Sequence, residues 1–292
     1  MLSRVIFMNG DLVAEEEATV SVFDHGFLYG DGVFEGIRAY DGKIFRLSEH
    51  VERLYESAHC IMMGIPYEPK ELERAIIETV KANDLVDAYI RVVVSRGKGD
   101  LGLSPKHCHN CQVVIIAGEI AVYPAELYRD GIEAVTVATR RNSVGALDPR
   151  IKSLNYLNNI LGHLEAARAG VREALMMNSD GYVTEGAADN LFVYRKGVLS
   201  TPPVYLGILE GITREAVIRL AREEDVPVEE RPITRQDIYT ADECFVTGTA
   251  AEIMPIVEVD ARSVGEGKPG PLTRRITELY RKLVIEEGTP LR

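Results

Sequence analysis

The sequence predicts an α+β protein of two domains. Its 292 residues are more than one small hydrophobic core can organise. Strand-like segments joined by tight-turn dipeptides are interspersed with amphipathic helical segments, and this order favours α+β over a doubly wound parallel sheet. Residues 118–127 follow neither period and contain Pro124. They are predicted to connect a first domain of residues 1–117 to a second of residues 128–292.

The first domain is predicted to begin with hairpins. Two dipeptides that favour tight turns lie between strand-like residues: Asn9-Gly10 in RVIFMNGDLV and Asp41-Gly42 in GIRAYDGKIFRL. One helix is expected from Ser48, which can cap it, and a second after Pro69. Residues 89–97 and 112–118 are typical of strands, and the second is apolar enough to be fully buried.

The second domain is predicted to continue the mixture of strands and helices. The expected elements are, in order, a strand at 133–140, a helix at 155–169 ended by Gly170, hairpins around Asp180-Gly181 and Lys196-Gly197, a helix from Thr213, a strand at 243–256 that runs into a loop, and a helix at 272–287.

The composition excludes several kinds of partner. The formal net charge is -12, so counterion release would not favour contact with nucleic acid. No basic amphipathic stretch suits an anionic membrane, and no apolar run approaches the roughly 20 residues needed to span one. The N-terminal residues lack the pattern of a signal peptide, and the 4 Cys are expected to be reduced thiols. The chain is therefore expected in the cytoplasm, with neither nucleic acid nor membrane as partner.

Two segments are suited to binding anions. In LEGITREAV, residues 209–217, Gly211 precedes a helix whose first N–H groups and Thr213 hydroxyl form a ready anion site. In VTGTAAE, residues 246–252, a strand ends in small residues that let backbone amides approach a ligand closely. Each is also explained by an ordinary capped helix or tight turn. Together they indicate a ligand with two anionic groups, such as a phosphate and a carboxylate.

Two ionisable residues are candidates for reaction with such a ligand. Lys152 precedes a helix. It is either a solvated surface lysine or, if buried, a nucleophile with a lowered pKa. Glu185 ends a strand ahead of small residues. It is either a surface glutamate in a hairpin or a buried carboxylate that needs a partner, for which a protonated pyridine nitrogen would serve.

Two further segments have motif-like composition. Residues 24–40, DHGFLYGDGVFEGIRAY, interleave glycines with aromatic residues but lack the Lys-Ser/Thr ending and the strand-turn-helix context of a phosphate loop. They are more typical of the wall of an apolar pocket. KHCHNC contains Cys108-x-x-Cys111, yet a structural zinc needs four ligands and no second pair exists. We expect a surface loop there and no metal.

In this order the segments resemble the fold-type IV pyridoxal 5′-phosphate (PLP) enzymes, and specifically the branched-chain amino acid aminotransferases. The resemblance covers nearly the whole chain and rests on YGDGVFEGIRAY, HVERL, YIR, IKSLNYLNN, VTEGAADNLF, LEGITRE and GTAAEI. It implies a D-amino-acid aminotransferase-like fold with PLP between the domains, anchored by the second. It also implies a homodimer or a higher homo-oligomer.

The resemblance implies roles toward the cofactor residue by residue. Lys152 matches the catalytic lysine that holds the cofactor covalently and moves a proton between the substrate Cα and the cofactor C4′. Glu185 matches the carboxylate that pairs with the pyridine N1 and keeps the ring an electron sink. Tyr156 is similar to the tyrosine that hydrogen-bonds O3′, and Arg53 to the arginine that grips the phosphate. The remaining cofactor positions are Leu209, Gly211, Ile212, Thr213, Gly248 and Thr249.

The resemblance also implies a substrate site. Arg91 would hold the distal carboxylate of 2-oxoglutarate, so that one pocket accepts both leucine and glutamate side chains. The apolar pocket is implied at Tyr29, Phe34, Gly36 and Tyr156, the rim at Arg38 and Arg91, the α-carboxylate site at Tyr89, Thr249 and Ala250, and a loop that reaches the neighbouring subunit at Leu101, Gly102 and Leu103.

The expected reaction transfers the amino group of L-leucine, L-isoleucine or L-valine to 2-oxoglutarate, giving the branched 2-oxo acid and L-glutamate. A D-amino-acid transaminase or an aminodeoxychorismate lyase on the same fold is the alternative, and a non-catalytic binding protein is a third. Arg38 and the run Gly248-Thr249-Ala250-Ala251 favour the branched-chain reaction.

The sequence departs from the family pattern in two places. Glu210 stands where proline is frequent, and Asp189 stands where glutamate or serine is common; neither is expected to touch the cofactor. A tyrosine that the connecting stretch often contributes to the partner's pocket falls near Val122 and Tyr123 and is assigned to neither.

Overall fold

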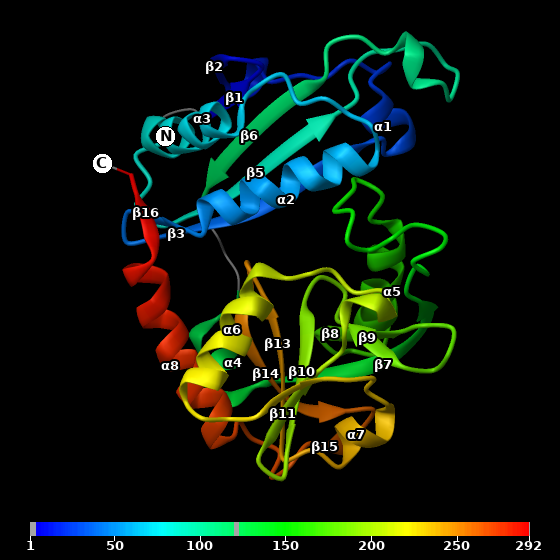
Figure 1. Cartoon of the computed structure of the whole chain (residues 1–292), viewed down its shortest axis with the longest axis vertical. Coiled ribbons are helices and arrows are strands. Elements are labelled where there is room, and N and C mark those ends of the chain that lie inside the picture. The colour runs from blue at the N-terminus through cyan, green and yellow to red at the C-terminus, as the bar shows by residue number, and fades with distance from the viewer. Residues whose placement is uncertain (1–3, 120–122, 292) are drawn as a thin grey trace. The chain divides into compact units, whose positions relative to one another are not determined.

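The computed structural model describes residues 4–119 and 123–291, and the chain divides into two compact units (Figure 1). Unit 1 consists of Met1–Ile120, Ile151–Asn155 and Leu283–Arg292. Unit 2 consists of Ala121–Arg150 and Tyr156–Lys282.

The predicted domain boundaries differ from these units in two places. Ile151–Asn155 and Leu283–Arg292 follow the predicted connection along the chain, yet both belong to unit 1. The reason is backbone pairing: Ser153 forms an antiparallel bridge with Val33, and the C-terminal residues form an edge strand of the unit 1 sheet. Tertiary pairing of this kind leaves no local sequence signal.

The predicted connection itself is only partly described. Residues 120–122, including Val122, lie outside the described residues. The remainder contains a short helix, α4, at Ala125–Asp130, which Gly131 follows with a φ of 86°.

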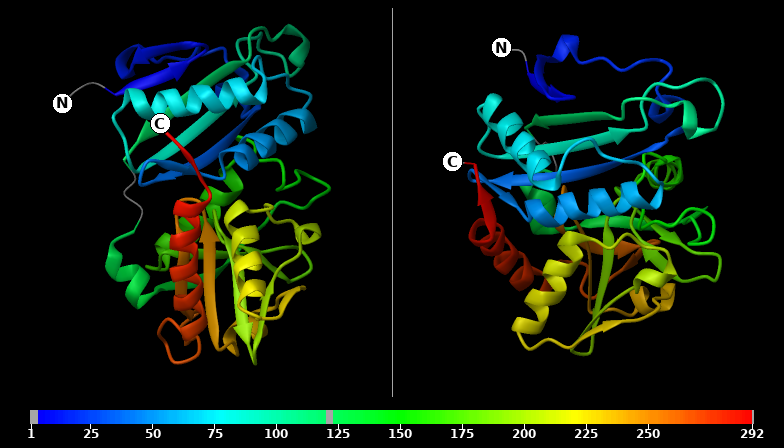
Figure 2. Two further views of the ribbon diagram at one scale, coloured as in Figure 1. Left: turned by 60° about the vertical axis from the view of Figure 1, so that its left-hand side comes forward. Right: turned by 45° about the horizontal axis from the view of Figure 1, so that its top comes forward.

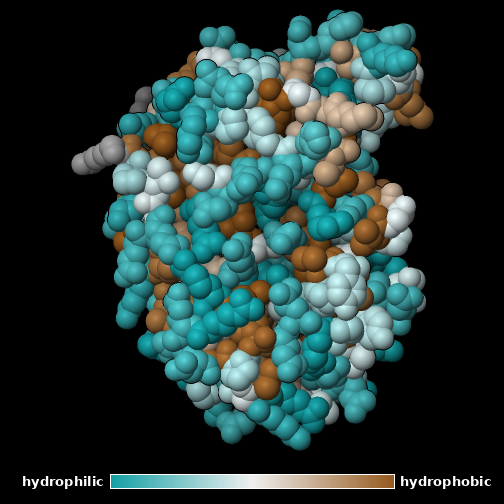
Figure 3. Space-filling model, viewed as in Figure 1, coloured by the Kyte–Doolittle hydropathy of each residue, from teal (hydrophilic) through white to brown (hydrophobic). Residues whose placement is uncertain are grey.

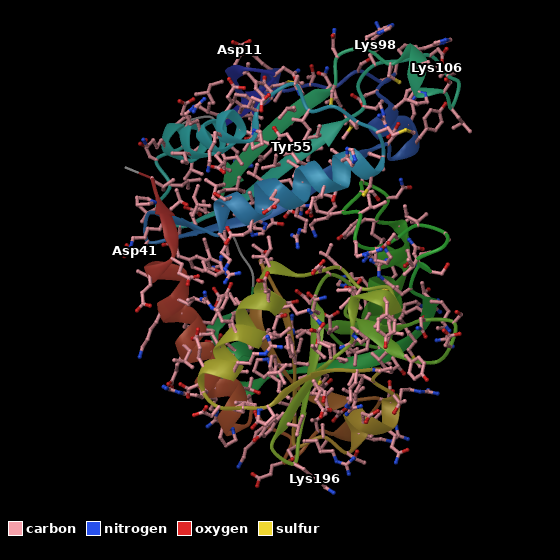
Figure 4. All side chains as sticks on the ribbon, viewed as in Figure 1. Asp11, Asp41, Tyr55, Lys98, Lys106 and Lys196 are labelled. Atoms are coloured by element: carbon pink, nitrogen blue, oxygen red, sulfur yellow. The ribbon has the colours of Figure 1, made fainter. Side chains whose placement is uncertain are left out.

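Unit 1 contains, within the described residues, a seven-stranded sheet of order β16-β4-β3-β5-β6-β1-β2, in which every pairing is antiparallel. The predicted hairpin turns at Asn9-Gly10 and Asp41-Gly42 are confirmed, and Asp41 is seen at its turn in Figure 4. The strands are β1 Val5–Met8, β2 Asp11–Ala14, β3 Gly32–Tyr40, β4 Lys43–Phe45, β5 Ala88–Ser95, β6 Gln112–Gly118 and β16 Gly288–Pro290.

Two long helices of unit 1 pack against the sheet through a shared hydrophobic core, and Figure 2 shows them in two further orientations. The helices are α1 His25–Tyr29, α2 Leu47–Cys60 and α3 Pro69–Ala82, with 3₁₀ turns at Glu15–Glu17 and Pro105–His107. The prediction that Ser48 caps α2 is wrong. The helix begins one residue earlier, after Arg46 in the left-handed conformation with a φ of 47°.

The prediction that β6 is fully buried is also wrong. Val113, Ile115 and Ala117 are buried in the core shared with α2 and α3, while the residues between them are partly exposed. An antiparallel sheet whose core lies on one face produces this alternation even when the sequence is apolar throughout.

Unit 2 contains, within the described residues, a nine-stranded sheet of order β12-β11-β10-β13-β14-β7-β8-β9, with β15 paired to β14. An additional pairing of Glu185 with Asn190 joins β9 back to β10, so the central strands close on themselves. The strands are β7 Ile132–Arg140, β8 Glu173–Met177, β9 Val183–Glu185, β10 Asn190–Arg195, β11 Val198–Thr201, β12 Val228–Glu230, β13 Glu243–Gly248, β14 Glu252–Val259 and β15 Arg262–Ser263.

Both predicted hairpins of unit 2 are confirmed, and Lys196 is labelled at its turn in Figure 4. The predicted strand at 243–256 is instead two antiparallel strands, because the chain turns at Thr249–Ala251. The helices are α5 Leu157–Arg168, α6 Ile212–Glu223, α7 Arg235–Tyr239 and α8 Pro271–Glu286, with a 3₁₀ turn at Val204–Leu206. Gly170, expected to end the 155–169 helix, lies one residue beyond the C-cap Ala169.

Hydrophilic residues cover most of the face shown in Figure 3. Among the described residues, no helix is long and apolar enough to cross a membrane.

Glu173, the first residue of β8, places a carboxyl group in the interior of unit 2. Its Oε1 accepts hydrogen bonds from the backbone N–H groups of Ala187 at 2.9 Å and Ala174 at 3.0 Å. Burial, and after it the charge of Asp189, raises the pKa of Glu173 to about 8, because both disfavour the ionised form. The folded state therefore retains a proton that the unfolded chain releases at a lower pH.

We expect the titration of Glu173 to lower the free energy of unfolding as the pH rises. The stabilisation by protonated Glu173 is complete below about pH 4.5 and is lost as the pH rises toward about 8. The slope is at most about 1.4 kcal/mol per pH unit. Glu173→Gln removes this titration, so urea denaturation should show the variant gaining stability relative to wild type across that range. Glu278→Gln, an exposed change on α8, is the control. Parallel pH profiles for Glu173→Gln and wild type would contradict the assignment.

Candidate functional site

Lys152 lies on a short extended segment that pairs with β3 in unit 1. The backbone N–H of Phe34 donates to the Lys152 carbonyl at 2.9 Å, and the N–H of Leu154 donates to the Gly32 carbonyl at 2.9 Å. On the α2 side, the N–H of Lys152 donates to the hydroxyl of Ser57 at 3.2 Å. The position of the lysine backbone is therefore fixed by a strand and by a helix.

The Lys152 side chain is half-buried, and its Nζ lies 4.9 Å from the centre of the Phe34 ring. The Arg91 guanidinium carbon lies 4.5 Å from the centre of the same ring. A cation near an aromatic face is stabilised by the ring quadrupole. The side chain thus contacts an aromatic residue of unit 1, which differs from the surface lysine that the sequence alone allowed.

Arg53 is bound to a carboxylate that the sequence analysis did not select. Its Nε donates to Oε1 of Glu35 at 2.7 Å and its NH2 donates to Oε2 at 2.8 Å. His50 Nδ1 lies 2.8 Å from the same Oε2. Glu35 has no exposed surface, so this cluster is an ionic site inside unit 1.

The residues expected to line the substrate pocket lie on neighbouring strands. The β3–β5 register places Gly36 opposite Arg91 and Arg38 opposite Tyr89. A Cβ atom on Gly36 would collide with the hydroxyl of Tyr89, so glycine is needed for the tyrosine ring to cross the strand. The Arg91 guanidinium carbon lies 5.5 Å from the Tyr89 ring centre. The structure thus brings these four residues together.

The loop with Leu101, Gly102 and Leu103 is exposed, and the two leucines are 69% and 80% exposed. The hydroxyl of Tyr29 donates to the Leu101 carbonyl at 2.6 Å, which ties the loop to α1. Cys108 and Cys111 are free thiols nearby, and the Cys111 thiol contacts the Ser95 carbonyl at 2.9 Å.

Glu185 is buried at the point where the strands of unit 2 close. Its Oε1 accepts a hydrogen bond from Nε of Arg141 at 2.6 Å. Its Oε2 accepts from the backbone N–H of Leu209 at 2.9 Å and from the side-chain amide of Asn190 at 3.3 Å. A buried carboxylate needs a partner, and within unit 2 the buried Arg141 is one such partner of Glu185.

Asn190 joins this carboxylate to the start of α6. Its amide also donates to the Leu209 carbonyl at 2.8 Å, and a Cβ atom on Gly211 would collide with its side-chain oxygen. Ile212 and Thr213 form the buried first turn of the helix. Gly211, the residue before that turn, is therefore packed against Asn190, which itself contacts Glu185.

The β13–β14 turn has the tight packing that small residues allow. A Cβ atom on Gly248 would collide with the carboxylate of Asp189, so this departure from the family pattern lies directly against the turn. Thr249 and Ala250 follow in the turn. The hydroxyl of Thr247 is buried, with no hydrogen-bond partner among the described residues. Glu210, the other departure, is exposed.

The remaining sequence candidates are placed as follows. Tyr156 stands at the N-cap of α5 in unit 2. Tyr123 packs edge-on against Tyr128 with ring centres 6.3 Å apart. Burial, and after it the charges of Asp189 and Glu173, raises the pKa of Tyr123 to about 12.

The candidate residues are divided between the two units. Unit 1 carries Tyr29, Phe34, Gly36, Arg38, Arg53, Tyr89, Arg91, Leu101, Gly102, Leu103 and Lys152, and unit 2 carries Tyr156, Glu185, Leu209, Gly211, Ile212, Thr213, Gly248, Thr249 and Ala250.

Sequence analysis missed Glu35, His50, Arg141 and Asn190. Glu35 did leave a signal, because it is a lone charge inside the otherwise uncharged run GVFEGI, and a buried charge requires a partner. Arg141 left none, since it follows Arg140 at a strand end where charged residues are ordinary.

Comparison with known proteins identifies the family. Residues 32–259 match the family described as Amino-transferase class IV. A Methanocaldococcus jannaschii protein with the provisional name branched-chain-amino-acid aminotransferase is 51% identical over 97% of this chain and 97% of its own. The branched-chain-amino-acid aminotransferase of Pseudomonas aeruginosa is 41% identical over 96% of this chain and 92% of its own.

Solved structures agree with these relatives. The Escherichia coli branched-chain amino acid aminotransferase superposes with a TM-score of 0.95 at 38% identity, covering 98% of this chain and 96% of that chain. The PLP-form of the Thermobaculum terrenum enzyme superposes with a TM-score of 0.91 at 36% identity, covering 99% of each chain. The fold class and the resemblance predicted from the sequence are confirmed. The chain belongs to the class IV aminotransferases, within the branched-chain-amino-acid aminotransferase family of PLP-dependent transferases.

Proposed function

We propose that the chain binds PLP through Lys152 and transfers the amino group of L-leucine, L-isoleucine or L-valine to 2-oxoglutarate. The observation that carries this proposal is the way in which the backbone and the side chain of Lys152 are held. Its backbone is fixed by β3 and α2, and its half-buried amine lies over the Phe34 ring. The Thermobaculum terrenum relative was solved in a PLP-form, which supports the choice of cofactor.

The chemistry of the described residues fits PLP. The first turn of α6 offers backbone N–H groups and the Thr213 hydroxyl, which suit a phosphate. Glu185 offers a carboxylate, which suits a protonated ring nitrogen. Lys152 offers the amine that a carbonyl group requires. The unpartnered Thr247 hydroxyl is a further polar atom that a bound ligand would satisfy. Leu209, Gly211, Ile212, Gly248, Thr249, Tyr156 and Arg53 complete the proposed cofactor residues.

When bound, PLP supplies a carbonyl group that takes up the amino group and a ring that withdraws electrons. The protein supplies the proton transfers and the orientation. We propose that Lys152 moves the proton at the substrate Cα, since its backbone is held on both sides. Glu185 keeps its carboxylate oriented because Arg141, Asn190 and the Leu209 N–H fix both of its oxygens.

For the substrate we propose a pocket with an apolar interior and a cationic rim. Phe34 and Tyr89 offer aromatic surface, and Arg91 lies against both rings. An apolar side chain is bound by contact with the rings, whereas the second carboxylate of 2-oxoglutarate requires a cation. Tyr29, Gly36, Arg38, Tyr156, Thr249, Ala250 and the 101–103 loop complete the proposed substrate residues. The cytoplasmic location stays a prediction.

The function is tested by the two half-reactions, observed separately. The purified chain loaded with PLP should show the visible absorbance of a lysine-bound cofactor, lose it with L-leucine and regain it with 2-oxoglutarate while L-glutamate forms. Lys152→Ala should lack this band and lose at least about 10²-fold in turnover. A response to D-alanine instead of L-leucine would support the D-amino-acid transaminase alternative and contradict the substrate proposal.

Arg91→Met is expected to separate the two substrates. The KM for 2-oxoglutarate should rise by about 10-fold or more, because a charge-assisted hydrogen bond contributes about 1.5–3 kcal/mol. The KM for L-leucine should change by less than about 3-fold, since only contact with an uncharged chain is altered. Steady-state kinetics measures both. Equal rises for the two substrates would assign Arg91 a general structural role.

We also propose a homodimer. Helix α5 exposes four large apolar side chains at helical spacing: Leu157 (65%), Ile160 (51%), Leu161 (44%) and Leu164 (51%). A contiguous apolar stripe of this kind is unusual on a monomer and typical of an interface. A second copy of the chain is the expected occupant, because homo-oligomers with twofold symmetry are the commonest assemblies.

Leu161→Glu should weaken this dimer. A charge in the middle of an apolar interface remains unpaired when buried, so sedimentation velocity should show a larger monomer fraction at equal concentration. Arg168→Glu, an exposed change near the end of the same helix, is the matched control and should leave the distribution unchanged. A monomeric wild-type protein would contradict the proposal.

A further inference from the structure

Among the described residues of unit 1, Glu35 is the ionisable group with the least exposed surface. It lies in the middle of β3, between Phe34 and Gly36, and it has no exposed surface. A carboxylate in such a position is costly unless its oxygens are fully hydrogen-bonded and its charge is balanced. The residues that hydrogen-bond the Glu35 carboxylate and balance its charge therefore indicate its role.

Two residues of α2 surround the Glu35 carboxylate. His50 and Arg53 are three positions apart and lie on the same face of the helix. Arg53 forms a bidentate pair through Nε and NH2 at 2.7 Å and 2.8 Å, and His50 Nδ1 contacts Oε2 at 2.8 Å. A bidentate pair fixes the plane of a guanidinium as well as its distance.

The surroundings shift the pKa values of both Glu35 and His50 downward. Burial opposes ionisation of Glu35, but the charge of Arg53 and the hydrogen bond from His50 outweigh it, and the pKa of Glu35 stays well below its usual value. Burial lowers the pKa of His50, with Arg53 and Lys152 adding to the effect against Glu35. In either protonation state His50 donates an Nδ1 proton to Glu35, because an ionised carboxylate is an acceptor only.

We propose that Glu35 and His50 are positioning residues that orient the Arg53 guanidinium toward the phosphate of the cofactor. The inference rests on the proposed function, in which Arg53 is a cofactor residue, and on the contact with the phosphate that the family resemblance implies for it. With Nε and NH2 engaged by Glu35, the planar guanidinium directs its NH1 edge away from the carboxylate. An arginine without this clamp has several rotatable bonds and loses entropy on binding an anion.

The clamp also ties the phosphate contact to the lysine. The backbone N–H of Phe34, the residue before Glu35, bonds to the carbonyl of Lys152 at 2.9 Å, and Val33 pairs with Ser153. One stretch of β3 thus fixes the backbone of Lys152 through its own backbone and contacts Arg53 through a side chain. A merely structural ion pair would affect stability but would not distinguish a phosphorylated ligand from its dephosphorylated form.

The test compares two ligands that bind without a covalent bond. Pyridoxamine 5′-phosphate and pyridoxamine are titrated calorimetrically into the full chain freed of cofactor. The dissociation constant of pyridoxamine divided by that of pyridoxamine 5′-phosphate measures the contribution of the phosphate to binding. Arg53→Lys should reduce this ratio by about 10-fold or more. Glu35→Gln should reduce it by a similar factor, and the double variant by little more, because both act through one contact.

His50 provides a second variant that keeps the buried charge. His50→Leu removes the Nδ1 donor and should lower the ratio by about 3-fold or more, whereas His50→Asn retains a donor at that position and should restore most of it. Asp31→Asn is the matched control. Asp31 also forms a bidentate pair, with Arg96 at 2.9 Å for both bonds, and its loss should leave the ratio unchanged.

The outcomes separate the two proposals. If Arg53→Lys leaves the ratio unchanged, Arg53 does not contact the phosphate, and both the assignment of Arg53 and the present inference are overturned. If Arg53→Lys lowers the ratio while Glu35→Gln and His50→Leu do not, the inference alone is overturned. A fall for Arg53→Lys, Glu35→Gln and His50→Leu, with Asp31→Asn unaffected, supports it.

Discussion

The pairing between β3 and residues 151–155 is the interaction on which the position of Lys152 in unit 1 depends. Two backbone hydrogen bonds, between Phe34 and Lys152 and between Leu154 and Gly32, hold a lysine that lies more than a hundred positions away along the chain. Backbone bonds of this kind do not depend on side-chain rotamers. The backbone from which the Lys152 side chain extends is therefore placed by the geometry of a sheet.

In each unit a buried carboxylate is paired with an arginine. In unit 1 Arg53 pairs with Glu35, and in unit 2 Arg141 pairs with Glu185. In both cases a second side chain, His50 or Asn190, contacts the carboxylate as well. Since breaking a buried pair leaves an uncompensated charge, replacement of either residue of a pair also affects the residue that remains. Such coupling favours retention of whole networks rather than of single residues.

Local signals predicted much of the fold, and tertiary pairing explains what they missed. The turns at Asn9-Gly10, Asp41-Gly42 and Lys196-Gly197 depend on positive φ at their own residues, and all were predicted. The edge strand β16 depends on β4, a partner far along the chain, so no window of sequence contains that pairing. For the site, the family motifs indicated Lys152, Glu185 and Arg53. Their arginine and carboxylate partners lie outside the pattern that the motifs describe.

The chain passes between the two units several times, which limits how the units can be separated along the sequence. Neither unit is a continuous stretch, because the chain changes unit after residues 120, 150, 155 and 282. A gene fragment that ended near residue 120 would encode neither the lysine segment nor the strand β16 that completes its sheet. A single crossover therefore cannot separate the two units as complete modules. Because residues 151–155 carry Lys152 into unit 1, that unit is complete only when the chain is present to its last strand.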